Sequence, residues 1–267
     1  MKKIFLTGAS SGIGKATAEV LLQRGHEVWG TSRDLSRIPQ WPRLHPVQLD
    51  LADRTSIRTG FAAALEGAGK FDVVINNAGS GHFGPAELAT DETIETLFET
   101  LVFAHIELCR LALASMRPQG SGMIVNVTSL AAELPVPFMG VYNATKAAMA
   151  SFTMTMQLEL GSSPIRLLDV QPGDISTEFN NSVPKSGMED SAYRAAAERT
   201  WIVVDRNMKN APKPQLVGRR IADLIEAQNP PPRVIVGDFF QSKIAPLIYR
   251  LLPQRMRVWG VRRYYGI

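Results

Sequence analysis

The chain has 267 residues, 45% of them apolar, which is enough for one large domain or two small ones with a full core. Its single cysteine, Cys109, excludes an internal disulfide and fits a reducing compartment. Six of the 29 basic residues lie in 239–267, and that segment holds no acidic residue. Residues 1–238 therefore carry 23 basic and 25 acidic side chains, a net charge of −2. This part of the chain shows no excess of positive charge that would indicate nucleic-acid binding.

The amino-terminal residues Met1, Lys2 and Lys3 lead directly into a short apolar segment, without the long apolar stretch of a secretory signal. No uncharged apolar run reaches the 18 or so residues of a membrane span. We therefore expect a cytoplasmic protein.

The first predicted strand, 4–7, leads into a glycine-rich turn at 7–14 and then into a helix. Glycines let the backbone approach a phosphate, and the free amides at a helix N-terminus favour its charge. The spacing is Gly-x-x-x-Gly-x-Gly, and a plain tight turn is the alternative. The strand before it and the helix after it favour dinucleotide binding.

The second predicted strand, 27–32, is followed by Arg33. At this point of a dinucleotide-binding fold, a carboxylate would bind the ribose 2′-hydroxyl, whereas an arginine suits a 2′-phosphate. Arg33 therefore favours NADP(H) over NAD(H). The neighbouring Asp34 argues for caution, and a solvated arginine without a ligand is the alternative.

Apolar strands alternate with helices along the rest of the chain. Further strands are predicted at 44–49, 73–75, 123–127, 165–171 and 234–237, and helices at 55–65, 91–116, 142–160, 188–206 and 216–227. This pattern predicts an α/β fold: one Rossmann-type, doubly wound parallel sheet of about seven strands with helices on both faces. We expect a catalytic domain at 1–238, including a helical substrate lid at 178–214, and a basic aromatic tail at 239–267. A functionless surface helical pair is the alternative for the lid.

Tyr142 and Lys146 lie one helical turn apart. A tyrosine pKa is normally about 10, and a neighbouring cation lowers it by stabilising the phenolate. Ser129, at the end of a predicted strand, could donate a hydrogen bond to the same substrate oxygen. These groups suit general acid–base chemistry, although an exposed helical pair is the alternative.

Several motifs, taken in order, resemble the short-chain dehydrogenase/reductase family, nearest to its hydroxysteroid- and retinol-dehydrogenase-like members. They are the turn at 7–14, Asp50, the Asn-Asn-Ala-Gly segment at 76–79, Ser129, Tyr142, Lys146, and Pro172-Gly173 with Thr177. The resemblance implies that Tyr142 exchanges a proton with the substrate oxygen, Ser129 orients that oxygen, and Lys146 lowers the Tyr142 pKa and holds the nicotinamide ribose. Hydride passes between nicotinamide and the carbonyl carbon.

The resemblance also implies a set of cofactor contacts. Asp50 would contact the adenine, Asn77 the adenosine ribose region and Thr177 the nicotinamide amide. The expected cofactor-binding residues are Gly8, Ser10, Ser11, Gly12, Ile13, Gly14, Arg33, Asp50, Leu51, Asn77, Ala78, Gly79, Tyr142, Lys146, Pro172, Gly173, Ile175 and Thr177. We expect no metal.

The expected substrate contacts are mostly apolar and contain no arginine pair that could bind a carboxylate or phosphate. They are Ser129, Leu134, Phe138, Tyr142, Phe179 and Trp201. We therefore expect an NADP-dependent short-chain alcohol dehydrogenase or carbonyl reductase acting on a lipophilic small-molecule alcohol or carbonyl compound.

One position departs from the family pattern. Members usually carry, about 24 residues after the second Asn of Asn-Asn-Ala-Gly, an asparagine that anchors a water in a proton relay; here that position is Leu101. Either a backbone carbonyl or another polar group serves the relay, or the protein binds cofactor with little turnover as a regulatory or sensor protein. The intact Ser129, Tyr142 and Lys146 favour the first reading. His105 is read as a packed core or interface histidine, with a ligand role as the alternative.

The tail interleaves its six cations with aromatic and aliphatic residues, and we expect Pro246 and Pro253 to divide it into short pieces. Its apolar side either packs on the body or on another subunit, or makes peripheral contact with an anionic membrane. The resemblance implies a homodimer or homotetramer that pairs the helices beginning near 91 and 142.

Overall fold

The computed structural model describes residues 1–189 and 192–267. Within this part of the chain, seven parallel strands form one sheet in the order β3-β2-β1-β4-β5-β6-β7. The strands are β1 (Lys3–Leu6), β2 (Glu27–Ser32), β3 (Leu44–Gln48), β4 (Val73–Asn76), β5 (Gly122–Val127), β6 (Ile165–Pro172) and β7 (Arg233–Val236). The predicted doubly wound Rossmann-type sheet is confirmed.

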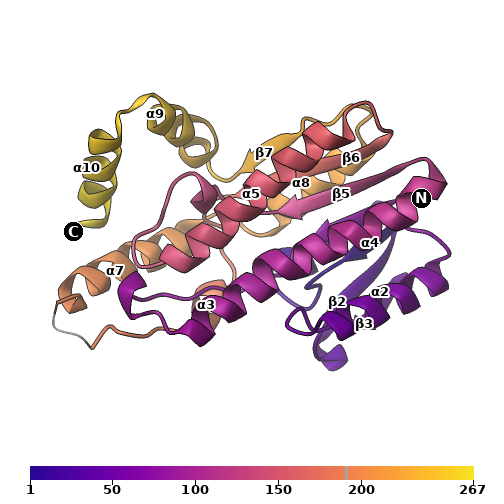
Figure 1. Ribbon diagram of the computed structural model, residues 1–267, viewed down its shortest axis with the longest axis horizontal. Coiled ribbons are helices and arrows are strands. Elements are labelled where there is room, and N and C mark those ends of the chain that lie inside the picture. Colours follow the sequence, from indigo (N-terminus) through magenta and orange to yellow (C-terminus); the bar gives the residue numbers. More distant parts are fainter. Residues whose placement is uncertain (190–191) are drawn as a thin grey trace.

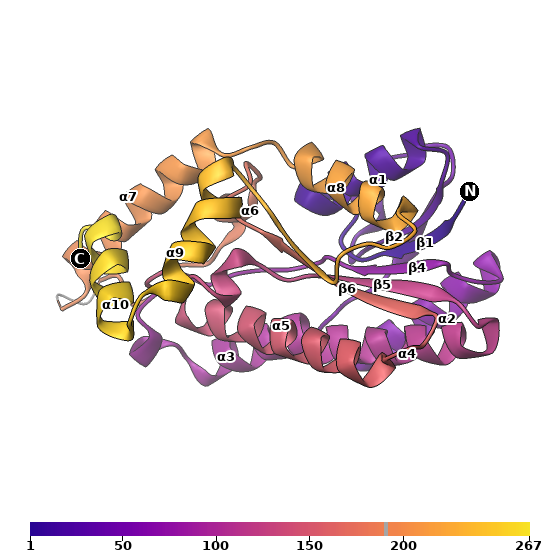
Figure 2. The same cartoon turned by 90° about the horizontal axis from the view of Figure 1, so that it is seen from above.

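Helices cover both faces of the sheet (Figures 1 and 2). One face carries α1 (Gly12–Gln23) and α8 (Gln215–Glu226), and the other carries α2 (Arg54–Ala68), α4 (Ala104–Gln119) and α5 (Gly140–Leu160). Successive strand side chains point to opposite faces, so Ile4 and Leu6 belong to the first apolar core and Phe5 to the second. A sheet buried on both faces explains the uniformly apolar strands.

The strand order reverses direction between β1 and β4, which is where ligands bind in open parallel sheets. The glycine turn follows β1, and the loops after β4, β5 and β6 open at the same carboxyl edge. The expected site residues therefore converge there, although they are far apart in the chain.

The long helix predicted at 91–116 is interrupted. It consists of α3 (Asp91–Phe98), a π-helical turn η3 (Glu99–Phe103) and α4, and the amide of Ala104 bonds to the carbonyl of Glu99. A π turn inserts one extra residue into a helix and is common at functional sites. Hydrophobic periodicity cannot reveal it, because the apolar stripe continues on both sides.

The lid and tail also differ in detail from their predictions. The lid contains the short α6 (Phe179–Ser182) and α7 (Arg194–Asn210), so the helix predicted from 188 begins later; 190–191 lie outside the described residues. The tail forms η5 (Phe240–Ile244), α9 (Ala245–Leu251) and α10 (Gln254–Tyr265). The expectation that Pro246 breaks the tail is wrong: Pro246 occupies the first turn of α9, where a missing N–H is tolerated. Pro253 does separate two helices, as predicted.

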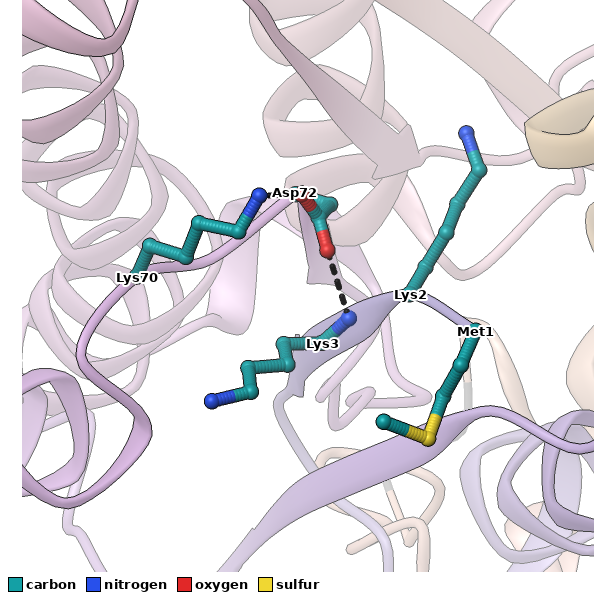
Figure 3. Close-up of a pocket in the computed structure, with 5 residues that line it drawn as sticks. All are labelled: Met1, Lys2, Lys3, Lys70 and Asp72. Carbon is teal, nitrogen blue, oxygen red and sulfur yellow. Dashed lines mark hydrogen bonds and ion pairs between the residues drawn. The ribbon is translucent and has the colours of Figure 1, made fainter.

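Figure 2 shows α7, α9 and α10 together at one end of the molecule, with the N-terminus at the other. A shallow depression lies at the amino edge of the sheet and is lined by Met1, Lys2, Lys3, Lys70 and Asp72 (Figure 3). The Lys3 amide donates to Asp72 over 2.8 Å, and Lys70 pairs with the same carboxylate at 3.0 Å. None of the expected site residues lines this depression. Among the described helices, none is long and apolar enough to cross a bilayer.

Candidate active site

The glycine turn has the geometry of a phosphate cradle. Gly8 and Gly12 have positive φ angles of 74° and 52°. A Cβ at Gly14 would lie 2.0 Å from the carbonyl oxygen of Gly8, so no side chain fits there. The side chain of Ser11, the N-cap of α1, makes no capping hydrogen bond, which leaves the first amides of the helix available to an anion.

Thr7 and Asn77 hold the turn against the next strand. The Thr7 hydroxyl accepts hydrogen bonds from the amides of Asn77 (2.9 Å) and Ala78 (3.0 Å), and Asn77 Nδ2 donates to the Thr7 carbonyl over 2.9 Å. Asn77 therefore braces the cradle, while its side-chain oxygen and the second proton of its amide group remain for a ligand. Gly79 continues this segment beside Lys146, whose Nζ would lie 3.8 Å from a Cβ placed on Gly79.

The carboxylate of Asp34 is occupied by its own turn. It accepts from the Ser36 amide (3.0 Å) and hydroxyl (2.7 Å), and these hydrogen bonds hold the pKa of Asp34 below its ordinary value. Arg33 is exposed and has no hydrogen-bond or ion-pair partner within the described chain. The arginine is thus the free group at the end of β2, whereas Asp34 caps a 3-10 turn.

Asp50 and Leu51 lie at the end of β3. One oxygen of Asp50 accepts the amide of Ala52 over 3.0 Å, while Leu51 is half-buried against the core formed with α2. The other Asp50 oxygen has no partner in the described part of the structure. This arrangement leaves Asp50 able to contact an adenine, as the resemblance implies.

The three residues predicted to be catalytic come together at the carboxyl end of β5. Ser129 follows β5, and its hydroxyl accepts from the Ala131 amide over 3.1 Å. Tyr142 lies in the first turn of α5, with a side-chain hydrogen bond to Ser129. Lys146, one turn on, places Nζ 5.7 Å from the centre of the Tyr142 ring and donates to the Val127 carbonyl over 3.2 Å. The predicted grouping of these three residues is present.

Burial dominates the electrostatics of this group. It raises the pKa of Tyr142 above its ordinary value, and the hydrogen bond from Ser129 opposes that rise only in part. Burial also lowers the pKa of Lys146 to about 8, with Asp169 acting in the opposite direction. The expectation that Lys146 lowers the Tyr142 pKa stays a prediction, because in this structure loss of solvent around the phenol is the larger effect and the net direction is upward.

Sequence reasoning missed Asp169. This residue is 1% exposed in β6 and accepts hydrogen bonds from Thr128, Gln171 and Arg233. Thr128 immediately precedes Ser129, so the carboxylate fixes the end of β5 and supports the charge on Lys146. An acidic residue inside an apolar strand was the available signal, since a buried charge needs partners.

The loop after β6 lies against the glycine turn. Thr177 would be 3.7 Å from a Cβ placed on Gly12, so it stands at the mouth of the cradle. Ile175 is 3% exposed and supports the loop from the core. Behind Pro172 and Gly173, the side-chain oxygen of Gln241 accepts the Asp174 amide over 2.9 Å. Gln241 belongs to the tail, a contribution that local sequence patterns do not reveal.

The substrate side is an apolar cluster that includes Tyr142. Its members are Phe83, Met139, Val183 and Ala197, with Val136, Phe138, Tyr142, Phe179, Met188 and Trp201 packed against them. The rings of Tyr142 and Phe179 lie 5.9 Å apart, and those of Phe83 and Trp201 lie 4.8 Å apart. The segment predicted to form a lid therefore packs against Tyr142.

Two of the predicted substrate contacts differ from expectation. Leu134 is half-buried in the turn after Ser129 but is not part of the cluster. Phe138 has φ of 62°, which is strained for a bulky residue, and its carbonyl accepts the Gly84 amide over 2.8 Å. Phe83, at the centre, was missed because it lies in a loop without periodic pattern.

A dinucleotide cradle and a Ser–Tyr–Lys group at the same edge of a parallel sheet define a nicotinamide-dependent oxidoreductase. The free amides, the absence of room for a Cβ at Gly14 and the position of Thr177 all fit a bound dinucleotide. The family model described as short chain dehydrogenase matches residues 2–187. The chain belongs to the short-chain dehydrogenase/reductase family, and it is an NAD(P)-binding oxidoreductase.

Known relatives agree with this membership. The chain is 31% identical over 273 residues to a 3-ketodihydrosphingosine reductase of Bacteroides thetaiotaomicron, covering 99% of this chain and 98% of the relative. It is 29% identical to an NADPH-dependent 1-acyldihydroxyacetone phosphate reductase of Saccharomyces cerevisiae, covering 86% and 80%. A short-chain dehydrogenase structure from Streptomyces avermitilis superposes with a TM-score of 0.79 at 28% identity, covering 98% and 93%.

Proposed function

We propose that this protein uses NADPH to reduce the ketone of a long-chain lipid to a secondary alcohol. The observation that carries the proposal is that Tyr142 belongs at once to the catalytic group and to the apolar cluster under the lid. The two relatives described above support it, because one is named as a reductase of 3-ketodihydrosphingosine and the other as a reductase of 1-acyldihydroxyacetone phosphate, both of which are lipid ketones. A 3-ketodihydrosphingosine-like ketone is therefore the substrate class that we favour over steroids and retinoids.

In this mechanism, Tyr142 donates its proton to the carbonyl oxygen while Ser129 donates a hydrogen bond to the same oxygen. Lys146 stabilises the negative charge that develops there. The nicotinamide supplies the hydride when it is bound. The raised pKa of Tyr142 keeps the phenol protonated near neutral pH, which suits a general acid and hence the direction of reduction.

The first test is Tyr142→Phe, assayed as NADPH oxidation with 3-ketodihydrosphingosine. Removing the acid should lower kcat by roughly 10²–10⁴-fold, the usual contribution of a general acid, while NADPH binding is retained. Equal turnover by the variant would exclude the assigned mechanism. If the wild-type protein binds NADPH but consumes none across a broad panel of carbonyl compounds, the regulatory or sensor alternative takes its place.

We also propose a preference for NADPH, supported by the free Arg33 and the occupied Asp34. Charge-assisted hydrogen bonds to a phosphate contribute about 1.5–3 kcal/mol. Arg33→Ala should therefore weaken NADPH binding by roughly tenfold to a hundredfold and leave NADH binding unchanged. Fluorescence titration measures both constants, and Arg220→Ala, an exposed arginine on α8, is the matched control. Equal weakening for both cofactors would place Arg33 away from the 2′-phosphate.

Assembly and location complete the proposal. We propose a homodimer or homotetramer that pairs α4 and α5 between subunits, as in the family that the chain belongs to. The place of action is the cytoplasm, at a membrane surface. Sedimentation velocity of the purified protein measures the oligomeric state, and binding to lipid vesicles tests the location at a membrane.

A further inference from the structure

The tail presents an unusual concentration of exposed apolar side chains. Sixteen large apolar side chains are exposed in the described structure, and nine of them lie in 239–267. These nine, with the cations beside them, form a surface that we call the lipid face. Its apolar members are Phe239, Phe240, Leu247, Ile248, Leu251, Met256, Val258, Trp259 and Tyr264. Isolated exposed apolar residues are ordinary, but a contiguous group marks an interaction site.

The cations of the lipid face are available to an anionic partner. Lys243, Arg250, Arg255 and Arg263 are exposed, and their side chains have no hydrogen-bond or ion-pair partner within residues 1–189 and 192–267. The other two cations have partners. Arg262 donates to the Ile267 carbonyl over 3.3 Å. Arg257 donates to the Leu252 carbonyl over 2.7 Å and lies over the Tyr249 ring, which fixes the corner between α9 and α10. The segment contains no acidic residue.

The lipid face lies beside the substrate lid (Figure 2). Arg199 of α7 donates to the Gly266 carbonyl over 2.7 Å, and Asn207 donates to the Tyr264 hydroxyl over 2.8 Å. Trp201, between them on α7, packs on Phe83 in the apolar cluster. The surface and the entrance to the catalytic tyrosine thus share one helix.

We infer that the lipid face docks this enzyme on an anionic membrane surface. Exposed aromatic and aliphatic side chains interleaved with cations fit the boundary between headgroups and acyl chains. A second copy of the chain fits less well, because a two-fold axis through this face would bring its cations against each other with no carboxylate between them. The inference does not depend on which lipid is reduced.

The experiment is co-sedimentation of the full chain with phosphatidylcholine vesicles, with and without phosphatidylglycerol. Binding should require the anionic lipid and weaken with salt. The combined variant Leu247→Ser, Leu251→Ser, Trp259→Ser should lose binding, while Leu158→Ser should not; Leu158 on α5 is 75% exposed, as Leu251 is at 76%. Arg250→Gln with Arg255→Gln should reduce partitioning roughly thirtyfold, at about 1 kcal/mol for each cation. Arg219→Gln with Arg220→Gln is the matched control.

Thermal unfolding checks that each variant folds. Unchanged vesicle binding by the triple serine variant, or absence of binding by the wild type, would overturn the inference. A self-association seen by sedimentation velocity and lost only in the triple variant would also overturn it, since a second copy would then cover the face.

A separate observation concerns His105. This histidine is 2% exposed, and its Nε2 has no hydrogen-bond partner among the described residues. Its ring forms a hydrogen bond with the Ala78 backbone, beside the cofactor cradle. Buried polar atoms are nearly always paired, so an unpaired nitrogen at an active site calls for a partner such as an ordered water.

The surroundings of His105 indicate that partner. Lys146 is close enough to act electrostatically on His105. Among the described residues, its Nζ donates only to the Val127 carbonyl, so two of its three protons remain for other acceptors. Leu101 lies in the π turn, about one helical turn before His105, and is fully buried. It packs near Gly79 and Lys146, at the position where family members usually carry the asparagine. Two charged groups influence this site electrostatically: the Lys146 ammonium adds to the lowering of the His105 pKa by burial, and the Asp169 carboxylate opposes the lowering of the Lys146 pKa by burial.

We infer that His105 holds a water against the Lys146 ammonium and so replaces the missing asparagine in proton supply. Nε2 accepts a hydrogen bond from the water, and the water oxygen accepts a hydrogen bond from the Lys146 ammonium. Burial lowers the pKa of His105 to about 3, so the ring stays neutral and Nε2 remains an acceptor at working pH. His105 is then a positioning residue, and this role rests on the proposed reductase function.

The test compares His105→Leu with His105→Gln, which retains an acceptor. The leucine variant should lose roughly tenfold to a hundredfold in kcat, with a changed pH profile and unchanged NADPH affinity, and glutamine should restore most of the loss. Cys109→Ala, one turn further along α4, should leave the pH profile unchanged. A high-resolution crystal structure should show the water in the wild type and not in His105→Leu. This measurement does not depend on which ketone is the substrate. An ordinary pH profile in His105→Leu, or no water in the wild type, would overturn the inference.

Discussion

At the scale of single residues, the site contains a buried cation, the ammonium group of Lys146, whose burial is unfavourable. Lys146 is 4% exposed, and its pKa falls to about 8 because burial penalises the ammonium. Within the described structure, only the Val127 carbonyl, through a hydrogen bond, and the Asp169 carboxylate, through its charge, offset the cost of burying this ammonium. Sites that need a particular charge commonly sacrifice stability for it. This residue should therefore be required for activity and costly for folding.

Replacing Lys146 with methionine should abolish turnover and raise stability at pH 7 by about 1–2 kcal/mol, since one pKa unit corresponds to about 1.4 kcal/mol and the lost bond to Val127 offsets part of the gain. The sign follows from linkage. The folded pKa lies below the unfolded one, so the penalty is complete below pH 8 and disappears as pH rises towards 10.5. Urea unfolding of both proteins at pH 7 and pH 10 measures the difference. A variant less stable than the wild type at pH 7 would contradict this account.

At the scale of elements, the turn between β1 and α1 tolerates no side chain where the helix begins. A Cβ at Gly14 would lie 2.0 Å from the Gly8 oxygen and 2.5 Å from Asn77 Nδ2. Hydrogen bonds to Thr7 fix Asn77, and the Gly8 amide donates to the Thr31 hydroxyl. The π turn η3 is the second local device, because it interrupts the helix at Leu101, beside Lys146. Both the glycine turn and the π turn depart from regular helical hydrogen bonding next to the predicted site residues.

Gly14→Ala should therefore destabilise the protein by about 1–3 kcal/mol, the usual cost of overpacking, and abolish cofactor binding. The matched control is Gly67→Ala in α2, where a Cβ would meet nothing closer than 3.9 Å. That change should stabilise the protein by about 0.4–1 kcal/mol, because alanine is the better helix former. Thermal unfolding and NADPH titration check both variants, and equal effects at the two glycines would refute the steric explanation.

At the scale of the whole molecule, the tail completes the site as well as presenting the lipid face. Gln241 holds both the amide and the carboxylate of Asp174, in the loop that lies against the glycine turn. Tyr265, near the end of α10, is half-buried; loss of solvent raises the pKa of its phenol, and the nearby Asp174 carboxylate adds to that rise. Removal of 239–267 would therefore disturb the catalytic loop, and point variants test the lipid face more cleanly than truncation does.

Gln241→Ala should raise the KM for NADPH by about tenfold, since the Asp174 amide loses its acceptor and the loop loses its position; one net hydrogen bond contributes about 0.5–1.5 kcal/mol. Ser242→Ala is the control, because the Ser242 side chain makes no hydrogen bond in the described structure. Steady-state kinetics at saturating ketone measure both. An unchanged KM in Gln241→Ala would show that the loop is held without the tail.

The sequence by itself determined the sheet, the cradle and the catalytic group, because each depends on residues close together in the chain or on a short periodic pattern. Gly8, Gly12 and Gly14 lie within one turn, and Tyr142 and Lys146 within one helical turn. Only the tertiary structure decided that burial raises the Tyr142 pKa, that Gln241 supports Asp174, and that His105 stands beside Lys146. These depend on solvent exclusion and on contacts between distant segments, neither of which local periodicity encodes.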